Sequence, residues 1–266
     1  MMNGEGLRGT IALVSLGIAL AAGAVVFLAS RASEPGGTTT ALPTREAKHS
    51  KEAAEPAAAR EPQLHLAAQG HPVLTVRDGQ RVDIHSAPGG PVVRTVGDET
   101  EFGSTRRFSV ARVEGEWVGV PNQFTGNDAL GWIRLDPDRL LSGYTRESMV
   151  IDLSEYRAQL YRGDQAIRSF TVAIGAPGTE TPTGQFAVSD TFRGNLNPAY
   201  GCCAVALTAE QSKLGAASLI GDRIAIHGTS GPLGVAISHG CVRAADRDVS
   251  ALVDKLPPGA PVTIQA

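Results

Sequence analysis

The chain of 266 residues is 42% hydrophobic and 19% charged, which is enough apolar material for a folded core and excludes wholesale disorder. Its length fits two small domains plus a targeting segment. Its 31 Gly and 16 Pro residues favour turn-rich β structure and argue against an all-helical fold. With 24 Lys and Arg against 27 Asp and Glu, the formal net charge is −3. No positive excess is available to hold a phosphate backbone, so nucleic acid is not an expected partner.

The amino-terminal segment predicts a membrane anchor. Residues 9–30 are 22 consecutive residues without a charge, flanked by Arg8 and Arg31. As a helix rising about 1.5 Å per residue they would extend about 33 Å, enough to cross a bilayer core of ~30 Å. A cleaved signal peptide is the alternative, although its apolar region usually runs only ~7 to 15 residues. We therefore expect a cytoplasmic tail at 1–8 and a single-pass protein of the cell membrane, with everything after the anchor outside.

Residues 31–70 predict a flexible linker. They contain no aromatic residue, no Val and no Ile, so they cannot bury enough apolar surface to offset the conformational entropy lost on folding. As a flexible chain this segment would span about 35 Å root-mean-square. Such a tether would carry the following domains away from the membrane surface.

Residues 71–145 predict a small β domain, because apolar and polar residues alternate along short segments separated by turns. The predicted strands are 74–76, 82–84 and 92–96, followed by an alternating pattern at Phe108, Val110, Trp117 and Val120. The chain has two Trp residues, Trp117 and Trp132, which either pack in the core or stack on a ligand. This pattern, with Gly131-Trp132-Ile133 in a late strand, resembles bacterial SH3-like modules. That resemblance implies a small β-barrel.

Residues 146–266 predict a second, mainly β domain with few helices. The predicted strands are 149–153, 158–161, 169–173, 184–190, 204–207, 223–226 and 262–265. A capping box at Thr208-Ala209-Glu210-Gln211 predicts the start of a short helix. A longer helix is predicted from Asp246 to Lys255, ended by Pro257-Pro258-Gly259. The whole chain is thus expected to combine a transmembrane helix, a small SH3-like β-barrel and a β-rich domain.

One cysteine and two histidines gather within 15 residues. Cys241 lies in the segment Ser238-His239-Gly240-Cys241-Val242-Arg243, and His227 precedes it. A thiol nucleophile needs a nearby base, and the base needs a third group that fixes its tautomer. The cluster therefore predicts a nucleophilic Cys/His site. A metal site and a set of buried structural residues are the alternatives, although the C-x-x-C spacing common in metal sites is absent.

Two sequence blocks carry a family resemblance. The first is His227 followed, after ten residues, by Ser238 to Arg243. The second is Gly175-Ala176-Pro177 together with Thr181-Pro182-Thr183-Gly184-Gln185-Phe186. In this order the blocks resemble the L,D-transpeptidase catalytic family of the YkuD type, over about residues 147–266. The loop between His227 and Ser238 is at the short end of what that family shows, whereas Cys202-Cys203 is not a hallmark of it.

The resemblance implies roles for individual residues. Cys241 would attack the carbonyl of a peptide bond after an L-configured centre, expel a D-amino acid and form a thioester. His227 would be the base, oriented by a backbone carbonyl near Gly228. Backbone N–H groups at Gly240 and Cys241 would stabilise the oxyanion. The residues implied in oxyanion stabilisation or loop support are Gly228, Ser238, His239 and Gly240, and a role as the base is the alternative for His239. Arg243 would either hold a substrate carboxylate or act as a structural pin.

These features together predict a membrane-tethered peptidoglycan L,D-transpeptidase. An L,D-carboxypeptidase, which would pass the same acyl-enzyme to water, and a non-catalytic wall-binding protein remain alternatives. Thioester chemistry needs no metal, nucleotide or organic cofactor, so none is expected. The expected partners are peptidoglycan stem peptides and, through the amino-terminal helix, the membrane. The resemblance also implies binding of carbapenem-type inhibitors.

The remaining cysteines, Cys202 and Cys203, are adjacent in a segment expected to be exported. They are predicted to be either reduced and packed or joined to each other, although ordinary disulfide geometry does not suit neighbouring residues. A bond from either of them to Cys241 would block the nucleophile and is not expected.

Overall fold

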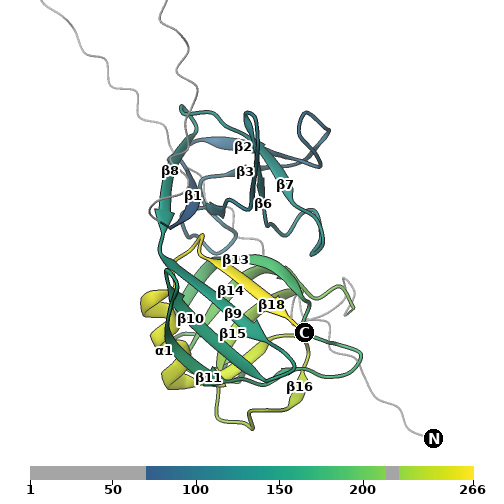
Figure 1. The fold of residues 1–266 in the computed structure, drawn as a ribbon, viewed down its shortest axis with the longest axis vertical. Helices are drawn as coiled ribbons and strands as arrows, with labels where there is room; N and C mark the ends of the chain where they lie inside the picture. Colours follow the sequence, from purple (N-terminus) through teal and green to yellow (C-terminus); the bar gives the residue numbers. More distant parts are fainter. Residues whose placement is uncertain (1–69, 214–221) are drawn as a thin grey trace, which may run out of the picture. The chain divides into compact units, whose positions relative to one another are not determined.

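The computed structural model describes residues 70–213 and 222–266 (Figure 1). The predicted anchor at 9–30 and the predicted linker, apart from Gly70, lie outside these residues. Within the described ranges no helix is long and apolar enough to cross a membrane. This part of the chain is mainly β, with one α-helix and one short 3-10 helix.

The first β unit covers residues 71–145 and contains two sheets. Its strands are β1 His71–Val76, β2 Arg81–His85, β3 Val92–Gly97, β4 Arg107–Ser109, β5 Arg112–Glu114, β6 Trp117–Val120, β7 Gly131–Arg134 and β8 Leu140–Thr145. One sheet has the order β4-β1-β8 and the other the order β3-β2-β7-β6-β5. Alternate residues of each strand point to one face, so Leu74 and Val76 of β1 meet Val82 and Ile84 of β2 in one apolar core.

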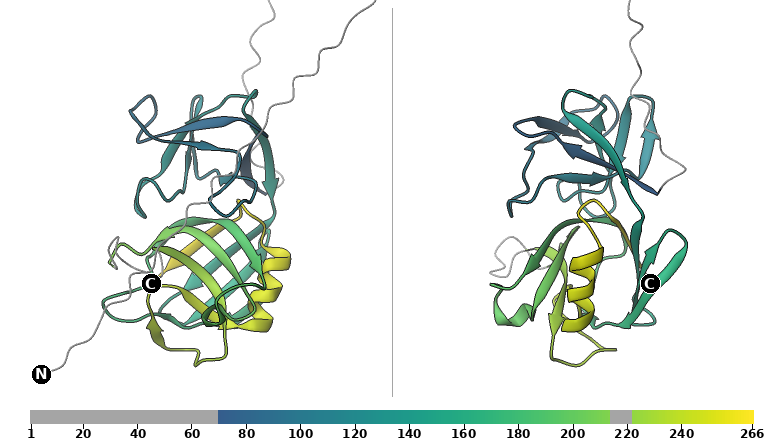
Figure 2. Two further views of the ribbon diagram at one scale, coloured as in Figure 1. Left: turned by 180° about the vertical axis from the view of Figure 1, so that it is seen from behind. Right: turned by 90° about the vertical axis from the view of Figure 1, so that its left-hand side faces the viewer.

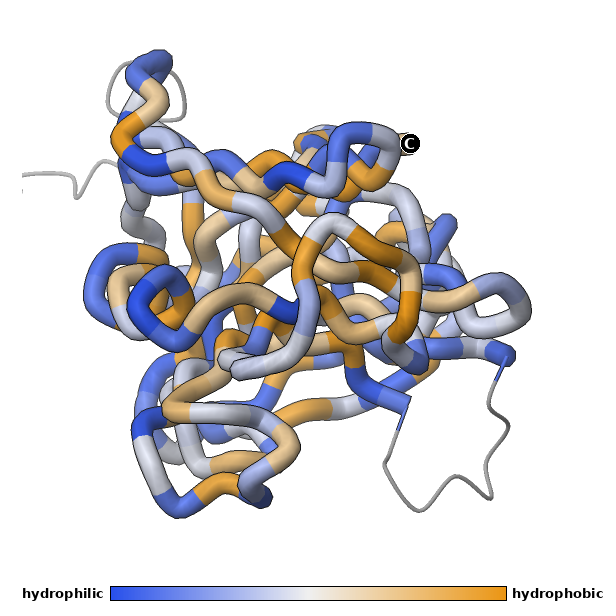
Figure 3. The backbone as a smooth tube through the Cα atoms, turned by 90° about the horizontal axis from the view of Figure 1, so that it is seen from below, coloured by the Kyte–Doolittle hydropathy of each residue, from blue (hydrophilic) through white to orange (hydrophobic). Residues whose placement is uncertain are grey.

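The second β unit is built on an eight-stranded sheet. Its strands are β9 Glu147–Asp152, β10 Arg157–Arg162, β11 Gln165–Thr171, β13 Gly184–Arg193, β14 Cys203–Glu210, β15 Arg223–Thr229, β17 Val242–Ala245 and β18 Pro261–Gln265. They lie in the order β11-β10-β9-β18-β13-β14-β15-β17. Several outer turns of the backbone are hydrophilic, whereas hydrophobic stretches lie mostly between them (Figure 3).

This sheet curls around a single core (Figure 2). Ala173, just after β11, forms an antiparallel bridge with Arg243 of β17, so the two edges of the strand order approach each other. Phe170 of β11 and Val242 of β17 consequently belong to the same buried cluster. A short parallel pair, β12 (Ile174–Gly175) and β16 (Ala236–Ser238), lies beside this closure. It brings the glycine turn of the second motif block next to the segment that contains Ser238.

The predicted helix at 246–255 is confirmed as α1 Asp246–Lys255, which packs across β14 and β15. Two acidic residues occupy its first turn and Lys255 its last, so the side-chain charges oppose the helix dipole at both ends. Val249 and Leu252 are fully buried, one turn apart on the face toward the sheet. The helix ends before Pro257, which cannot continue the backbone hydrogen-bond pattern.

The helix predicted to begin at Thr208-Ala209-Glu210-Gln211 is wrong at residues 208–210, which belong to β14. Both neighbours of β14 in the sheet, β13 and β15, pair with it. The Thr208 hydroxyl, which a capping box would use within its own turn, instead accepts a hydrogen bond from Ala187 N of β13 at 3.0 Å. Pairing with two neighbouring strands therefore outweighs the local capping signal.

Candidate active site

Two parallel strands, β15 and β17, bring the Cys/His cluster together. Their register pairs Ile226 with Val242 and His227 with Arg243. Side chains alternate between the two faces of a sheet, and Ile226 and Val242 are both buried in the core. His227, Arg243 and Cys241, which adjoin them, therefore point to the opposite face.

His227 is buried and its ring is held by the backbone. Its Nδ1 lies 2.9 Å from the carbonyl oxygen of Gly228. A carbonyl can only accept, so Nδ1 donates and Nε2 carries the free lone pair. Burial lowers the pKa of His227 and the positive charge of Arg243 lowers it further, whereas the bond to Gly228 raises it. The net effect is a neutral imidazole with Nε2 available as a base.

Cys241 is a free, partly buried thiol. Its Sγ lies 3.9 Å from the carbonyl oxygen of Arg223, to which the S–H group donates. Burial raises the pKa of Cys241, while a hydrogen bond from the backbone of Ala225 and the charge of Arg243 oppose that rise. The resting pair is thus a neutral thiol and a neutral imidazole on one face. Such a pair can form a thiolate by transferring the proton to Nε2 as the sulfur attacks.

The loop before Cys241 is held by Ser238, whose side chain is buried. Its hydroxyl donates to Cys241 O at 2.6 Å and accepts from Gly240 N at 3.1 Å. Gly240 has a φ of 115°, a conformation that L side chains rarely adopt. A Cβ there would lie 2.4 Å from Gln211 Nε2. The turn that presents the thiol therefore requires glycine.

Two further residues hold the same loop, and sequence reasoning gave neither of them a role. The buried Thr181 hydroxyl donates to Gly240 O at 2.7 Å and accepts from Gly175 N at 2.9 Å. The buried Gln211 amide donates to Glu180 O and His239 O, both at 3.1 Å. Thr181 could have been found from its place in the Thr-Pro-Thr-Gly block. Nothing in the sequence around Gln211 indicates this function.

The other predicted residues lie around this centre. The His239 side chain is exposed, and its contribution to the loop is the backbone carbonyl that Gln211 reaches. Gly240 N–H is occupied by Ser238. No backbone partner for Cys241 N–H occurs within the described ranges. Arg243 is half-buried, and among those residues its buried Nε has no hydrogen-bond partner.

Metal ligation finds no support in residues 70–213 and 222–266, where no three His, Cys, Asp or Glu side chains are grouped to hold an ion. Cys202 and Cys203, two of the ligands considered for a metal site, are joined in a disulfide. Neither can then supply a thiolate.

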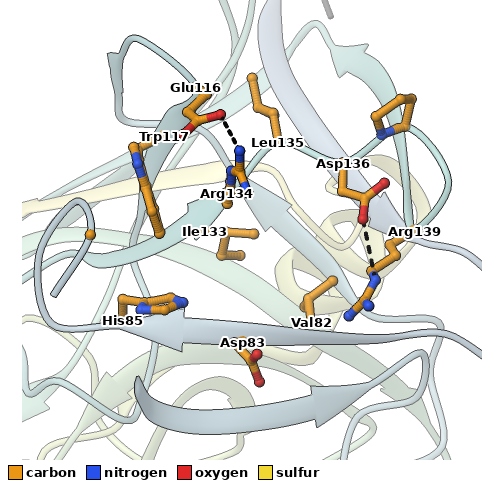
Figure 4. Close-up of a pocket in the computed structure, with 12 residues that line it drawn as sticks. Val82, Asp83, His85, Glu116, Trp117, Ile133, Arg134, Leu135, Asp136 and Arg139 are labelled. Atoms are coloured by element: carbon orange, nitrogen blue, oxygen red, sulfur yellow. Dashed lines mark hydrogen bonds and ion pairs between the residues drawn. The ribbon is translucent and has the colours of Figure 1, made fainter. Parts of the chain in front are cut away.

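The first β unit has a separate cavity of about 810 Å³ (Figure 4). Trp117 forms one wall and meets the ring of His85 edge-on at 4.9 Å. The ion pairs Arg134–Glu116 and Arg139–Asp136 also line it. Trp132, in contrast, is only 8% exposed. The two tryptophans therefore differ: Trp132 is a packing residue and Trp117 faces open space.

Residues 146–264 match the family model of the L,D-transpeptidase catalytic domain YkuD. This segment is therefore similar to the YkuD catalytic domain. Both motif blocks fall inside it, as do Cys241, His227 and the residues that hold the loop. The interpretation of the sequence as a YkuD-type catalytic domain is confirmed at this level.

The chain also aligns with curated relatives. The chain is 28% identical over 118 residues to the YkuD protein of Bacillus licheniformis, covering 44% of this chain and 64% of that protein. It is 32% identical over 103 residues to the YkuD protein of Bacillus subtilis, covering 38% and 55%. The chain therefore spans about three fifths of the length of these relatives. A crystal structure of an L,D-transpeptidase from Mycobacterium tuberculosis H37Rv matches with 17% identity and a TM-score of 0.40, covering 53% of this chain and 73% of that one.

Proposed function

We propose that the chain is a peptidoglycan L,D-transpeptidase that cross-links stem peptides through a thioester on Cys241. The observation that carries this proposal is the placement of Cys241, His227 and Arg243 on one face of the β15/β17 pair, with His227 Nδ1 bonded to Gly228 O. The family match at residues 146–264 supports the reaction class. Acyl transfer by this set needs a nucleophile, a base with a fixed tautomer and a donor for the oxyanion.

The reaction begins at the thiol. The proton of Cys241 passes to Nε2 of His227, and the thiolate attacks the carbonyl carbon of a peptide bond after an L-configured centre. The oxyanion accepts a hydrogen bond from Cys241 N–H, since the neighbouring amide of Gly240 already donates to Ser238. The C–N bond then breaks, and the imidazolium gives its proton to the departing amine of the D-amino acid. The product of this half-reaction is a thioester on Cys241.

The second half-reaction reverses these steps with a new amine. An amino group of another stem peptide attacks the thioester, loses its proton to His227 and restores the thiol. Arg243 is proposed to hold a substrate carboxylate near the reacting bond, because this half-buried residue places its positive charge beside Cys241 and His227. The anchor predicted at 9–30 and the linker after it would place this reaction outside the membrane, at the wall.

The test is the product pattern of the purified chain given a disaccharide tetrapeptide. A transpeptidase releases D-Ala and forms a dimer joined through the L-centre of the donor's third residue, identified by mass spectrometry. The Cys241→Ala variant should form neither product, whereas Ile167→Ala, a change at a partly exposed position of β11, should behave like the unmodified chain. Tripeptide without dimer at high acceptor concentration would instead show a carboxypeptidase. No product at all would favour the wall-binding alternative.

A carbapenem gives a second test of the nucleophile. Its strained lactam carbonyl is an acyl donor that a thiolate opens, leaving the drug attached to sulfur. We expect the intact mass of the unmodified chain to rise by one adduct and that of Cys241→Ala to stay unchanged. An adduct on the variant would refute the role of Cys241.

A further inference from the structure

A disulfide next to the proposed base has no part in the reaction above. Cys202 and Cys203 are joined to each other, and they follow the 3-10 helix η1 (Pro198–Tyr200) at the start of β14. The register of β14 and β15 pairs Ala204 with His227. Cys203 of the disulfide therefore directly precedes Ala204, the residue that pairs with His227.

This segment is fastened to the first turn of α1. Cys202 N donates to Asp246 Oδ1 at 3.2 Å, and Cys202 Sγ lies 3.4 Å from the carbonyl oxygen of Asp246. Gly228 lies directly beneath the same carboxylate, because a Cβ on Gly228 would come within 2.1 Å of Asp246 Oδ1 and 3.1 Å of Cys202 N. The segment therefore packs on the residue whose carbonyl holds His227 Nδ1.

Tyr200 extends this packing to the imidazole itself. Its ring meets the ring of His227 edge-on, with centroids 4.9 Å apart and planes at 75°. Edge-to-face aromatic pairs contribute about 0.5–1.5 kcal/mol beyond the area that they bury. His227 is consequently held twice, through Nδ1 by Gly228 and on its ring by Tyr200. Tyr200 belongs to the segment 200–203, and Gly228 packs against that segment.

We propose that Tyr200 is a positioning residue for His227 and that the Cys202–Cys203 disulfide keeps it in place, so that reduction of this disulfide loosens the imidazole. The proposal rests on the role of His227 in the proposed function. The reductant is a dithiol. One of its thiolates attacks a disulfide sulfur, which frees one protein thiol and forms a mixed disulfide, and its second thiol then attacks that mixed disulfide and releases the other protein thiol. Cys202 and Cys203 gain two electrons and two protons as the dithiol becomes a disulfide.

Loosening of the His227 imidazole should change the pH at which it becomes protonated. Besides Cys241, the ionisable side chains that the contacts and register place beside His227 are Arg243 on β17, Asp246 on α1 and Tyr200 on η1. The others on these elements are Glu210 on β14, Arg223 on β15 and Arg247, Asp248, Asp254 and Lys255 on α1. Burial is the largest influence on the imidazole and favours its neutral form. Once Tyr200 moves away, water reaches the ring and the acidic limb of any reaction assisted by His227 should shift to higher pH.

The experiment measures how fast iodoacetamide alkylates Cys241 in the full chain between pH 4 and pH 9. Peptide mapping by mass spectrometry separates Cys241 from Cys202 and Cys203, and the chain is compared before and after treatment with dithiothreitol that is then removed. A well-placed general base contributes ~10²–10⁴-fold to a rate. Partial loss of its placement should lower the alkylation rate about 10-fold near neutral pH and move the acidic limb upward.

Variants separate this effect from a general loss of structure. Tyr200→Ala should match the reduced chain even when its disulfide is intact, while Tyr200→Phe, which keeps the ring, should match the unmodified chain. The double variant Cys202→Ala/Cys203→Ala should show the slow profile and no response to the dithiol. Circular dichroism establishes that each variant is folded. If Tyr200→Ala and the reduced chain both keep the unmodified profile, the proposal is overturned.

The readout needs no peptidoglycan, so the two proposals can fail separately. A chain that alkylates as expected but never forms the cross-linked dimer would refute the transpeptidase proposal and leave the positioning role standing. A chain that forms the dimer equally well before and after reduction, with an unchanged alkylation profile, would refute only the role of the disulfide and Tyr200.

Discussion

Thr181 links the two motif blocks, and the change Thr181→Val tests how much that link stabilises the fold. Valine has nearly the shape of threonine but no hydroxyl, so the substitution removes two buried hydrogen bonds without leaving a cavity. Gly240 O loses a donor at 2.7 Å and Gly175 N loses an acceptor at 2.9 Å. Each buried polar group left without a partner costs about 1–3 kcal/mol. The free energy of unfolding should therefore fall by about 2–6 kcal/mol.

The assay is urea unfolding followed by far-ultraviolet circular dichroism, combined with hydrogen exchange at the amide of Gly175. That amide should exchange faster in the variant because its acceptor is gone. Thr183→Val, in the same Thr-Pro-Thr-Gly block but at an exposed position, is the matched control and should change stability by no more than ~0.5 kcal/mol. A loss below about 1 kcal/mol in Thr181→Val, or unchanged exchange at Gly175, would refute this account of the loop.

Three further changes follow from the same geometry. Gly240→Ala should cost at least about 1–2 kcal/mol of stability, because alanine in this positive-φ conformation is strained and its Cβ would also crowd Gln211 Nε2. It should slow Cys241 alkylation more than any exposed-site substitution does, and equal rates would contradict the turn requirement. Burial lowers the pKa of His227 below its ordinary 6.5, so the neutral base persists as pH falls through 6.5, and acylation should be lost only at lower pH; an acidic limb at or above 6.5 in the pH–rate profile would contradict this. Asp248, whose side chain is only 9% exposed, has two ion-pair partners, Arg168 at 2.5 Å and Arg247 at 3.8 Å. Arg168→Met removes the closer partner and should cost about 2 kcal/mol in urea unfolding. Arg247→Met removes the more distant one, at a side chain 84% exposed, and should cost almost nothing.

Alternation of apolar residues was sufficient to predict most of the long strands. β10 and β18, for instance, contain the predicted segments 158–161 and 262–265, since each buries every second side chain. β8 Leu140–Thr145 was not predicted because only its two end residues are buried, which leaves no periodic signal. β17 was also missed, as its four residues overlap a motif that was interpreted for chemistry alone.

Some residues of the candidate site could be predicted from local sequence, and others could not. The candidate nucleophile and base could be named because their motif is local, whereas their placement on one face depends on the parallel pairing of β15 with β17. Gln211 contacts residues 28 and 31 positions away. Contacts of that kind are set by the packing of the whole domain, and the same residue looked from sequence like the end of a capping box.

The uneven placement of the aromatic residues gives the chain a built-in optical label. The chain has two tryptophans, Trp117 and Trp132, both in the first β unit, and that unit has an apolar cluster separate from the cluster of the second β unit. Intrinsic tryptophan emission should report the melting of the first unit alone, whereas circular dichroism averages over both. A gap between the two denaturation midpoints would measure, without any added dye, how loosely the two halves are coupled.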